Sequence, residues 1–572
     1  MFNMKKLAGF LVVALIFSSI GFFSSPYIIR ALFDNASNPG KSYQNPAGPG
    51  EDAKVEERSK KLPDDVKIEP SDTEPAPAPE VDAASLPEKF NIKWEVWSGN
   101  KQVQDYKRGE TLSFGNSAAY SDVEGVTSFR GNNYRNAPGY GFVDLKEGKL
   151  EKAWSIKIGY IDTWTGVGWT GQPAIVKWSD KVKNLMNINA EKKKKPQLKE
   201  VIYATLDGNI YFLDLDDGLA TRPPINVGSP HKGSVSVDPR GYPLLYAGQG
   251  IEQVAGKHVP TGYRIFSLID QRLLHFIDGY DPFALRKWPA FDSGSLLDKK
   301  TDTLVEIGEN GVIYTLKLNT KFDVKKKSIS INPETAKYRY VSPRNSQLGT
   351  ENSPVIYKNF IYFADNSGLL HCVDLNTFKP VWTRYVNDDT DSSLVLEEYN
   401  DSEVYLYTAC EVDKQGENGS SYIRKINALT GELLWEKAYK CFYDSYTNGG
   451  TLASPVIGKQ EIQNLVIFNI ARTGSKTGGK LVAFDKKTGR EVWVINLKYY
   501  CWSSPVDVYT KEGKAYLIVC DSGGFMSLVE AKTGRIMDRI PLEGTIEASP
   551  AVYNDMVVVG TRGQKIWGVR IK

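Results

Sequence analysis

One phrase recurs along this chain and limits the folds that it can adopt. Residues 485–493 read DKKTGREVW, residues 427–435 read NALTGELLW, and residues 374–382 read DLNTFKPVW. Weaker copies lie at 530–538, where Asp538 stands in the tryptophan position, and at 214–218. On both sides of each phrase apolar and polar residues alternate, which is typical of strands joined by a tight turn. Such self-similarity indicates a repeat architecture.

A second mark recurs between the copies of this phrase. A small polar residue, followed by Pro or an aliphatic residue, opens an apolar segment at Gln172, Ser234, Ser295, Ser353, Ser393, Ser454, Ser504 and Ser549. Between the two marks, residues 353–382 alternate through four segments separated by turn residues, which predicts an antiparallel meander. One meander cannot bury both of its faces, and radial stacking of meanders gives a β-propeller.

The two ends of the repeat region predict how the ring closes. The last unit, which begins near Ser549, holds three strands. Residues 149–159, at the front of the region, supply a fourth strand in which Trp154 takes the tryptophan position of the phrase. An N-terminal strand that completes the last blade removes two exposed sheet edges. We therefore expect an all-β fold, an eight-bladed β-propeller of four-stranded antiparallel blades over residues 148–572.

Each residue of the phrase has a structural role in such a fold. The Asp or Asn that opens it accepts hydrogen bonds from backbone N–H groups of the turn, and the Gly supplies the positive φ that the reversal requires. The Trp lies on the following strand and faces the neighbouring blade, where burial of one indole removes about 150–250 Å² from water. The docking residues are Asp374, Trp382, Asn427, Gly431, Trp435, Asp485, Gly489, Trp493, Gly534 and Trp154.

The copies at 427–435 and 485–493 resemble the tryptophan-docking repeat of the pyrroloquinoline-quinone-like (quinoprotein-type) propellers. That family includes quinoprotein dehydrogenases and also non-catalytic binding propellers, among them the propeller subunit of the bacterial outer-membrane protein assembly machine. The resemblance extends over residues 148–572 and implies the fold. It leaves the function open, because one propeller serves many purposes.

Three segments precede the predicted propeller. Residues 1–35 contain a basic flank and the apolar run LAGFLVVALIFSSIGFF, which predicts a single-pass anchor in the cell membrane; a cleaved signal peptide, and hence a secreted protein, is the alternative. Residues 36–88 are rich in Pro and acidic residues and predict a disordered tether. Residues 89–147 predict a short β-rich lead-in that packs across one end of the ring.

Composition narrows the classes of function. The formal net charge of +3 leaves no electrostatic footprint for nucleic acid. For a dehydrogenase the resemblance implies an adjacent-cysteine disulfide against the quinone, and this sequence has no Cys-Cys pair among its five cysteines. No histidine lies within zinc-ligand spacing of another. We expect no catalytic residue, no cofactor and no metal, whereas a disulfide between Cys441 and Cys501 stays open.

The mouth of the central channel is the remaining place for a site. The turns that precede the innermost strands line one mouth, and four of them carry a carboxylate. Carboxylates beside aromatic side chains suit a sugar, a cation or a basic peptide, although such residues also serve only to satisfy loop backbone. The candidate binding residues are Trp169, Gln172, His231, Asp292, Glu351, Asp391, Trp502 and Glu547.

These observations predict a membrane-tethered, extracytoplasmic and monomeric propeller. We expect it to bind a protein, a peptide or a cell-wall component and to catalyse nothing. Two alternatives remain, a divergent quinoprotein dehydrogenase and a propeller that senses a small ligand. The absence of the cysteine pair disfavours the first, and only the contents of the mouth separate the second from the leading prediction.

Overall fold

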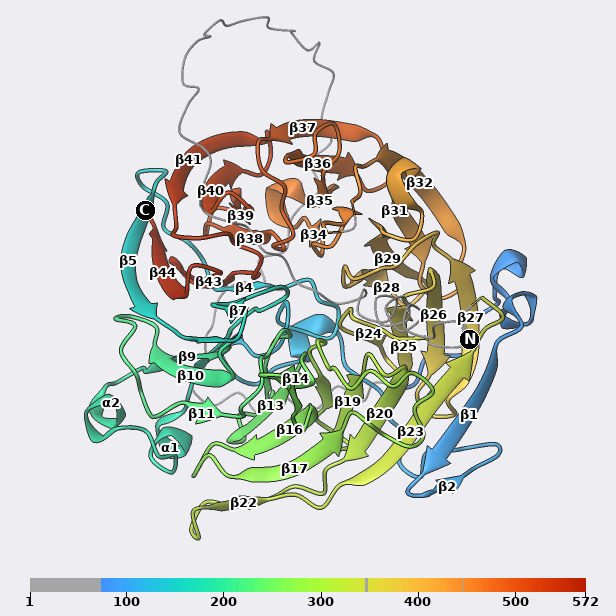
Figure 1. The fold of residues 1–572 in the computed structure, drawn as a ribbon, viewed down its shortest axis with the longest axis horizontal. Coiled ribbons are helices and arrows are strands. Elements are labelled where there is room, and N and C mark those ends of the chain that lie inside the picture. The colour runs from blue at the N-terminus through green and yellow to red at the C-terminus, as the bar shows by residue number, and fades with distance from the viewer. Residues whose placement is uncertain (1–73, 345–347, 445) are drawn as a thin grey trace, which may run out of the picture. The chain divides into compact units, whose positions relative to one another are not determined.

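A computed structural model describes residues 74–344, 348–444 and 446–572. In these residues the regular structure is nearly all strand, with two short α-helices, α1 (Asp180–Lys183) and α2 (Ala190–Lys194), and five 3-10 helices of three or four residues. Eight antiparallel sheets stand around a common axis (Figure 1). The predicted eight-bladed β-propeller is therefore confirmed.

Each blade has four strands, and in the first seven blades these follow chain order from the axis outward. Blade 1 consists of β8 (Ala174–Lys177), β9 (Lys199–Ala204), β10 (Asn209–Asp214) and β11 (Ile225–Asn226). Blade 2 consists of β12 (Ser236–Val237), β13 (Leu244–Gly248), β16 (Gly262–Ser267) and β17 (Leu273–Asp278). Blade 3 consists of β18 (Leu296–Asp298), β19 (Thr303–Ile307), β20 (Val312–Lys317) and β23 (Glu334–Val341), and blade 4 consists of β24 (Val355–Tyr357), β25 (Phe360–Ala364), β26 (Leu369–Asp374) and β27 (Lys379–Tyr385).

The second half of the ring repeats this order. Blade 5 consists of β28 (Val395–Asn400), β29 (Glu403–Ala409), β31 (Ser420–Asn427) and β32 (Leu433–Lys440). Blade 6 consists of β34 (Val456–Ile457), β35 (Leu465–Ala471), β36 (Gly479–Asp485) and β37 (Glu491–Leu497). Blade 7 consists of β38 (Val506–Tyr509), β39 (Ala515–Cys520), β40 (Phe525–Glu530) and β41 (Arg535–Pro541), and blade 8 consists of β42 (Ala551–Tyr553), β43 (Met556–Thr561), β44 (Lys565–Ile571) and β5 (Leu150–Lys157).

The last blade closes as the sequence predicts. Its outer strand β5 comes from the start of the repeat region and pairs antiparallel with β44, from Leu150 opposite Ile571 to Lys157 opposite Lys565. The two ends of the repeat region thus share one sheet. This arrangement leaves no gap in the ring between the last blade and the first.

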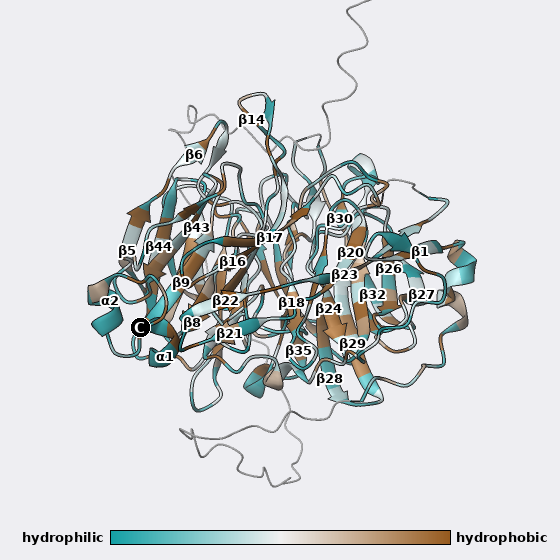
Figure 2. Ribbon diagram, turned by 90° about the horizontal axis from the view of Figure 1, so that it is seen from below, coloured by the Kyte–Doolittle hydropathy of each residue, from teal (hydrophilic) through white to brown (hydrophobic). Residues whose placement is uncertain are grey.

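The core lies between neighbouring blades, because the side chains of each inner strand alternate between two seams. In β13, Leu245 and Ala247 belong to the hydrophobic cluster shared with blade 1. Leu244 and Tyr246 belong to the cluster shared with blade 3. Inner strands buried on both faces read as nearly continuous apolar segments, and Figure 2 shows the apolar residues concentrated in the strands of the ring.

Tryptophan and glycine join successive blades at four seams. The indole Nε1 of Trp382 donates a hydrogen bond to Ala428 O, and the corresponding bonds run from Trp435 to Lys486 O, from Trp493 to Ala531 O and from Trp154 to Leu215 O. Three residues after each acceptor comes a glycine with positive φ, on which the indole lies: Gly431, Gly489, Gly534 and Gly218. The glycine of one phrase thus receives the tryptophan of the preceding blade.

Several short strand pairs add to the four strands of each blade. Three hairpins stand apart from the blades: β6 (Tyr160–Ile161) with β7 (Trp164–Thr165), β14 (Gln253–Val254) with β15 (Lys257–His258), and β21 (Lys321–Asp323) with β22 (Ser328–Ser330). The pair β30 (Glu411–Val412) with β33 (Gly449–Gly450) extends the sheet of blade 6, because β33 pairs with β35. Figure 2 shows β6, β14 and β30 on the same side of the ring.

Residues 125–140, which we call the plug, lie inside the ring alongside the inner strands of the blades. Its first strand β3 (Gly125–Val126) pairs with β8 of blade 1, and its last strand β4 (Gly139–Tyr140) pairs in parallel with β42 of blade 8. Between them, Asn133 O accepts the N–H of Ile356 in blade 4, and Tyr134 O accepts the N–H of Leu396 in blade 5. The predicted lead-in therefore occupies the channel as well as contacting the blades.

The beginning of the described chain lies on the outside of the ring. Strand β1 (Lys93–Ser98) adds to the outer edge of blade 3 by pairing with β23, and β2 (Lys101–Gln102) pairs with β1. Ahead of β1, a strap of residues 76–85 lies along blades 4 and 5, where Val81 joins a hydrophobic cluster. Residues 74–88 of the predicted disordered tether are thus ordered, because they bury apolar and backbone groups on the ring, whereas residues 36–73 lie outside the described residues.

The predicted localisation is corrected by the helices. In the part of the chain that the structure describes, no helix is long and apolar enough to cross a membrane. The longest α-helix, α2, has five residues, whereas a transmembrane helix needs about 20. The predicted single-pass anchor in the cell membrane, with the propeller outside, is contradicted by this finding. The anchor itself, residues 1–35, lies outside the described residues.

Candidate functional site: the acidic channel mouth

The serines that open the inner strands bond the blades to one another. The N–H of Ser353 donates to Ser393 Oγ over 2.8 Å, that of Ser454 to Ser504 Oγ over 3.0 Å, and that of Ser504 to Ser549 Oγ over 3.1 Å. The N–H of Gly294 and Gln172 donate likewise to Ser353 and Ser234. The accepting serines, Ser234, Ser353, Ser393, Ser504 and Ser549, form what we call the serine girdle. The small polar residues that open the inner strands therefore have a structural role.

Two arginines of the plug form the floor beneath the girdle. Arg130 donates to the carbonyl oxygens of Pro455 and Pro505, in blades 6 and 7. Arg135 donates to those of Pro354 and Gly294, in blades 4 and 3. Both side chains are fully buried, and burial lowers the pKa of each to about 10. These bonds thus cross the channel below the girdle and leave the mouth on the side where the inner strands begin.

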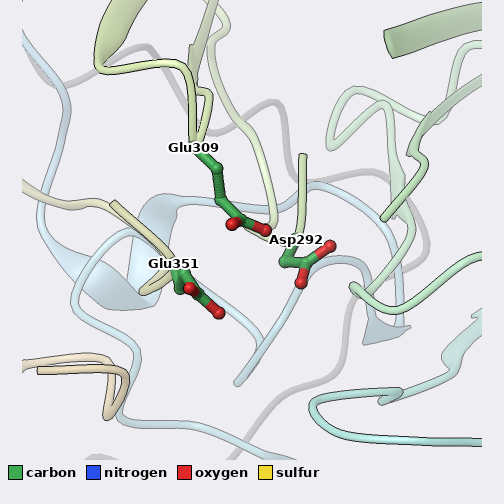
Figure 3. Close-up of side chains that lie close together, drawn as sticks. All are labelled: Asp292, Glu309 and Glu351. Carbon is green, nitrogen blue, oxygen red and sulfur yellow. The ribbon is translucent and has the colours of Figure 1, made fainter. Parts of the chain in front are cut away.

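Three carboxyl groups of blades 3 and 4 converge at the mouth. Asp292 precedes β18, Glu309 follows β19, and Glu351 precedes β24. One carboxylate oxygen of each lies within 4.8 Å of the others, and Figure 3 shows the three groups side by side. Asp292 and Glu309 are each 1% exposed, whereas Glu351 is half-buried. Lys232 contributes one positive charge, with its Nζ 2.6 Å from Asp292 and 3.9 Å from Glu309.

A second triad lies at the mouth in blade 5. It consists of Asp389, Glu411 and Asp413, again with one carboxylate oxygen of each within 4.8 Å of the others. Lys414 Nζ lies 2.7 Å from Asp389 and 3.9 Å from Asp413. The N–H groups of Asp413 and Lys414 bond to the carboxylate of Asp388, which holds this loop in place.

The two triads form one electrostatic unit. Burial, together with Glu351 and Asp292, raises the pKa of Glu309 well above its usual range. Burial, together with Asp389, does the same for Glu411. The pKa of Asp391 is also raised well above its usual range, by burial and then by Glu411 and Glu351. The mouth therefore holds more carboxyl groups than its two lysines can neutralise, and a cation that enters among them favours their charged forms.

The pKa values of the two lysines are raised as well, which favours their charged forms. Burial disfavours the charge of Lys232, but Asp292, Glu309 and Glu351 outweigh that effect and raise its pKa well above the usual range. Burial likewise opposes the charge of Lys414, and Asp389 outweighs it. Each triad thus already holds one ammonium group, which shows the kind of group that it accommodates.

The remaining candidates from the sequence have individual surroundings. His231 is 1% exposed, its Nδ1 lies 2.6 Å from Gly248 O, and burial lowers its pKa to about 4, so the ring is neutral at pH 7. Trp169 is 9% exposed. Trp502 is half-buried and lies 5.2 Å from Tyr500, measured between ring centroids.

Glu547 and Gln172 belong to other contacts. Glu547 pairs with Arg562 over 3.6 Å, and burial raises its pKa. Gln172 accepts a hydrogen bond from the N–H of Arg130 and donates one to Pro550 O, so it connects the plug to blade 8. The structure thus brings Asp292, Glu351 and Asp391 together with residues that sequence reasoning missed.

Two of the missed carboxylates, Glu309 and Glu411, come from the far ends of second strands. Glu309 lies two residues beyond the end of β19. Glu411 directly follows Cys410 and lies two residues beyond the end of β29. Because the first two strands of a blade are antiparallel, the start of one and the end of the other lie at the same edge. An acidic residue one or two positions beyond each second strand was therefore the signal that could have found them.

The first triad is suited to a hard cation. Calcium takes carboxylate oxygens as ligands, and Asp292, Glu309 and Glu351 supply three in one place, two of them from buried groups. A bound calcium ion would neutralise this charge. The surroundings of a quinone are less well matched, because all five cysteines are free and buried at separate positions, including Cys441 and Cys501.

Comparisons with known proteins agree with this fold. The family whose model matches the chain is described as outer membrane protein assembly factor BamB, and the match covers residues 334–500 and 477–572. No curated protein matches the chain. The solved structure of BamB from Moraxella catarrhalis is 16% identical, with a TM-score of 0.45, and the alignment covers 74% of this chain and 98% of that one.

Two dehydrogenases are also among the similar solved structures. The quinohemoprotein alcohol dehydrogenase ADHIIG from Pseudomonas putida HK5 is 12% identical, with a TM-score of 0.54, over 81% of this chain and 83% of that one. A europium-containing methanol dehydrogenase is 13% identical, with a TM-score of 0.39, over 78% of this chain and 98% of that one. The family match over residues 334–500 and 477–572, the eight blades and the tryptophan–glycine seams together show an eight-bladed β-propeller that carries PQQ-like repeats.

Proposed function

We propose that this propeller is a non-catalytic binding module, and that a cationic segment of a partner protein docks in its acidic mouth. The observation that carries the proposal is the convergence of the two carboxyl triads with Asp391, paired with Lys232 and Lys414. Buried carboxylates that raise one another's pKa repel each other when charged, so a cation that enters among them is stabilised.

The plug limits what enters the mouth. Because Arg130 and Arg135 bond across the channel below the serine girdle, a ligand reaches the triads from one side only. A mouth with the plug beneath it admits side chains of a docked segment and does not thread a chain through the ring. Lysine or arginine side chains fit this description, since each triad already accommodates an ammonium group.

Binding of a labelled hexalysine peptide to the full chain, followed by fluorescence anisotropy at low and at physiological salt, tests the proposal. We expect binding that weakens with salt, and about tenfold weaker binding for Glu351→Gln combined with Asp391→Asn. Glu432→Gln, at an exposed carboxylate of the outer rim, is the matched control. Equal binding by the double variant and the unaltered chain would contradict a site at the mouth.

One observation favours a second candidate, a divergent quinoprotein dehydrogenase. The first triad supplies the oxygen ligands that calcium prefers. Thermal unfolding with calcium alone, with pyrroloquinoline quinone alone and with both separates the two functions. A rise in melting temperature that requires both additions, together with reduction of an artificial electron acceptor by an alcohol, would favour the enzyme over the binding module.

A further inference from the structure

The four tryptophan–glycine seams are chemically alike, but one of them is covered. At the seam between blades 4 and 5, the strap lies over Gly431, with the N–H of Asp82 bonded to Thr430 O and Ser85 Oγ bonded to Gly431 O, both over 2.9 Å. Ser85 and Trp382 are both fully buried there. The strap therefore shows how an extended segment occupies a seam of this type.

Apolar contacts add to these hydrogen bonds. Ala76 and Val81 of the strap pack against the same hydrophobic cluster as Val381, which directly precedes Trp382, and Leu433, which follows Gly431 by two residues. Arg384 donates to both Ser85 Oγ and Gly431 O and lies 3.6 Å from Asp82. An acidic residue, a hydroxyl and an apolar residue of the strap thus meet matching groups on the ring.

The seam between blades 6 and 7 repeats the apolar positions without a cover. Val492 directly precedes Trp493, and Ile536 follows Gly534 by two residues, so they correspond to Val381 and Leu433. Val492 is 53% exposed and Ile536 is 45% exposed. Exposed β-branched residues at positions that are covered elsewhere in the same ring indicate an interaction surface.

Charges near this seam favour an acidic segment. Lys532 and Arg535 flank Gly534, and their side chains are 64% and 63% exposed. Lys532 lies 3.9 Å from Glu461 and Arg535 lies 3.2 Å from Glu530, and exposed pairs of this kind are weak enough for an acidic segment to compete with them. The strap that covers the first seam contains Glu80 and Asp82 within PAPAPEVDAAS. At the seam between blades 5 and 6, by contrast, Glu491 takes the position of Ile536, so an acidic segment is disfavoured there.

We propose that the seam between blades 6 and 7 is a docking site for an extended, acidic and proline-containing segment of a partner protein, with the chemistry of residues 76–85. The segment places an apolar residue on Val492 and Ile536 and an acidic residue beside Lys532 and Arg535. Its backbone and a hydroxyl bond to the carbonyl groups of the turn at Thr533 and Gly534. This surface is on the outer side of the ring and is independent of the mouth.

A peptide copy of residues 74–89, labelled with fluorescein, tests this site on the full chain by fluorescence anisotropy. We expect weak binding, with Kd about 0.1–1 mM as for a small interface. Val492→Lys and Ile536→Lys should each weaken it at least fivefold. Leu434→Lys is the matched control, because Leu434 is an exposed apolar residue that precedes Trp435 at the unsuited seam. Hydrogen exchange should show protection of residues 488–495 and 533–537.

Three results would overturn the proposal. The first is no binding at 1 mM peptide. The second is binding that Ile536→Lys leaves unchanged and Arg384→Ala alters, since the peptide would then exchange with the strap at its own seam. The third is a dimer of the full chain, seen by light scattering, that Ile536→Lys dissociates, which would assign the surface to a second copy. A hexalysine that still binds the Ile536→Lys variant confirms that the mouth is intact.

Discussion

Trp493 lies so close to Gly534 of the next blade that a Cβ atom on Gly534 would be 2.8 Å from the indole Cε3. Gly534 has a φ of +76°, and its turn also supplies the carbonyl of Ala531 that accepts the indole N–H. One glycine thus meets two requirements, a left-handed backbone and an empty space for an aromatic ring. The first belongs to its own blade and the second to the preceding one.

Replacing this glycine should destabilise the ring through both requirements. Gly534→Ala introduces strain of about 1–2 kcal/mol from the left-handed backbone, and overpacking against the indole adds about 1–3 kcal/mol. Gly228→Ala is the matched control, because Gly228 has a φ of +74° and open space around its Cβ position. Thermal and denaturant unfolding measure the difference. Equal losses in the two variants would show that the seam absorbs the added methyl group.

The seam also shows how far the sequence predicts this fold. Alternation, turn residues and the spacing of Trp382, Trp435 and Trp493 were sufficient for the blades and for closure by β5, because each feature acts locally or repeats. The partner of each tryptophan was predictable only as a neighbouring blade. That the partner is the glycine of the next copy depends on the stacking of two blades, which a single phrase does not contain.

The candidate site could be predicted only in part, because its side chains come from different turns of the ring. Asp292, Glu351 and Asp391 precede inner strands and were found by reading equivalent turns around the ring. Glu309 and Glu411 come from other turns and join them only through the antiparallel return of the second strand. Arg130 and Arg135 lie in a segment without periodicity, so no pattern in the sequence places them across the channel.

The serine girdle gives a second prediction. Ser549→Ala removes the acceptor of the N–H of Ser504, which lies in a buried turn. An unsatisfied buried N–H costs about 1–3 kcal/mol, so the variant should unfold at lower denaturant concentration. Ser330→Ala, in the exposed end of β22, is the control and should change stability by less than about 0.5 kcal/mol. A Ser549 variant as stable as the control would mean that water replaces the hydroxyl.

The raised pKa values at the mouth predict how stability depends on pH. The folded chain raises the pKa of Glu309 and Glu411 above their unfolded value, about 4.3. Their protonated forms therefore stabilise the fold fully below that value, and this contribution is lost as pH rises through the folded pKa. Glu309→Gln should raise the melting temperature at pH 7 and have little effect at pH 4.

His231 has to be separated from this effect. Its folded pKa is lowered to about 4, so its contribution is lost as pH falls from about 6.5 towards 4, in the opposite direction. The difference in melting temperature between Glu309→Gln and the unaltered chain, measured at each pH, removes that contribution. Glu417→Gln, at an exposed carboxylate of the same face, should give a difference near zero throughout. A Glu309 difference that does not grow from pH 4 to pH 7 would contradict the raised pKa.

The last prediction tests whether the plug stabilises the ring of blades. Arg135 donates to Pro354 O, Gly294 O and Phe129 O, and these acceptors are buried. Arg135→Met keeps an apolar stem but leaves carbonyl groups of two blades unsatisfied, at a cost of roughly 3–5 kcal/mol. Arg490→Met, at an exposed turn, should be nearly neutral.

Limited proteolysis distinguishes the two ways in which Arg135→Met could lose stability. If the plug is integral to the ring, cleavage within residues 125–140 and cleavage within the blades should increase together, because their bonds to β8, β24, β28 and β42 form one cooperative set. If cleavage rises only within residues 125–140 and the melting temperature of the blades is unchanged, the plug is a separate unit. In that case the plug does not fix the floor of the mouth.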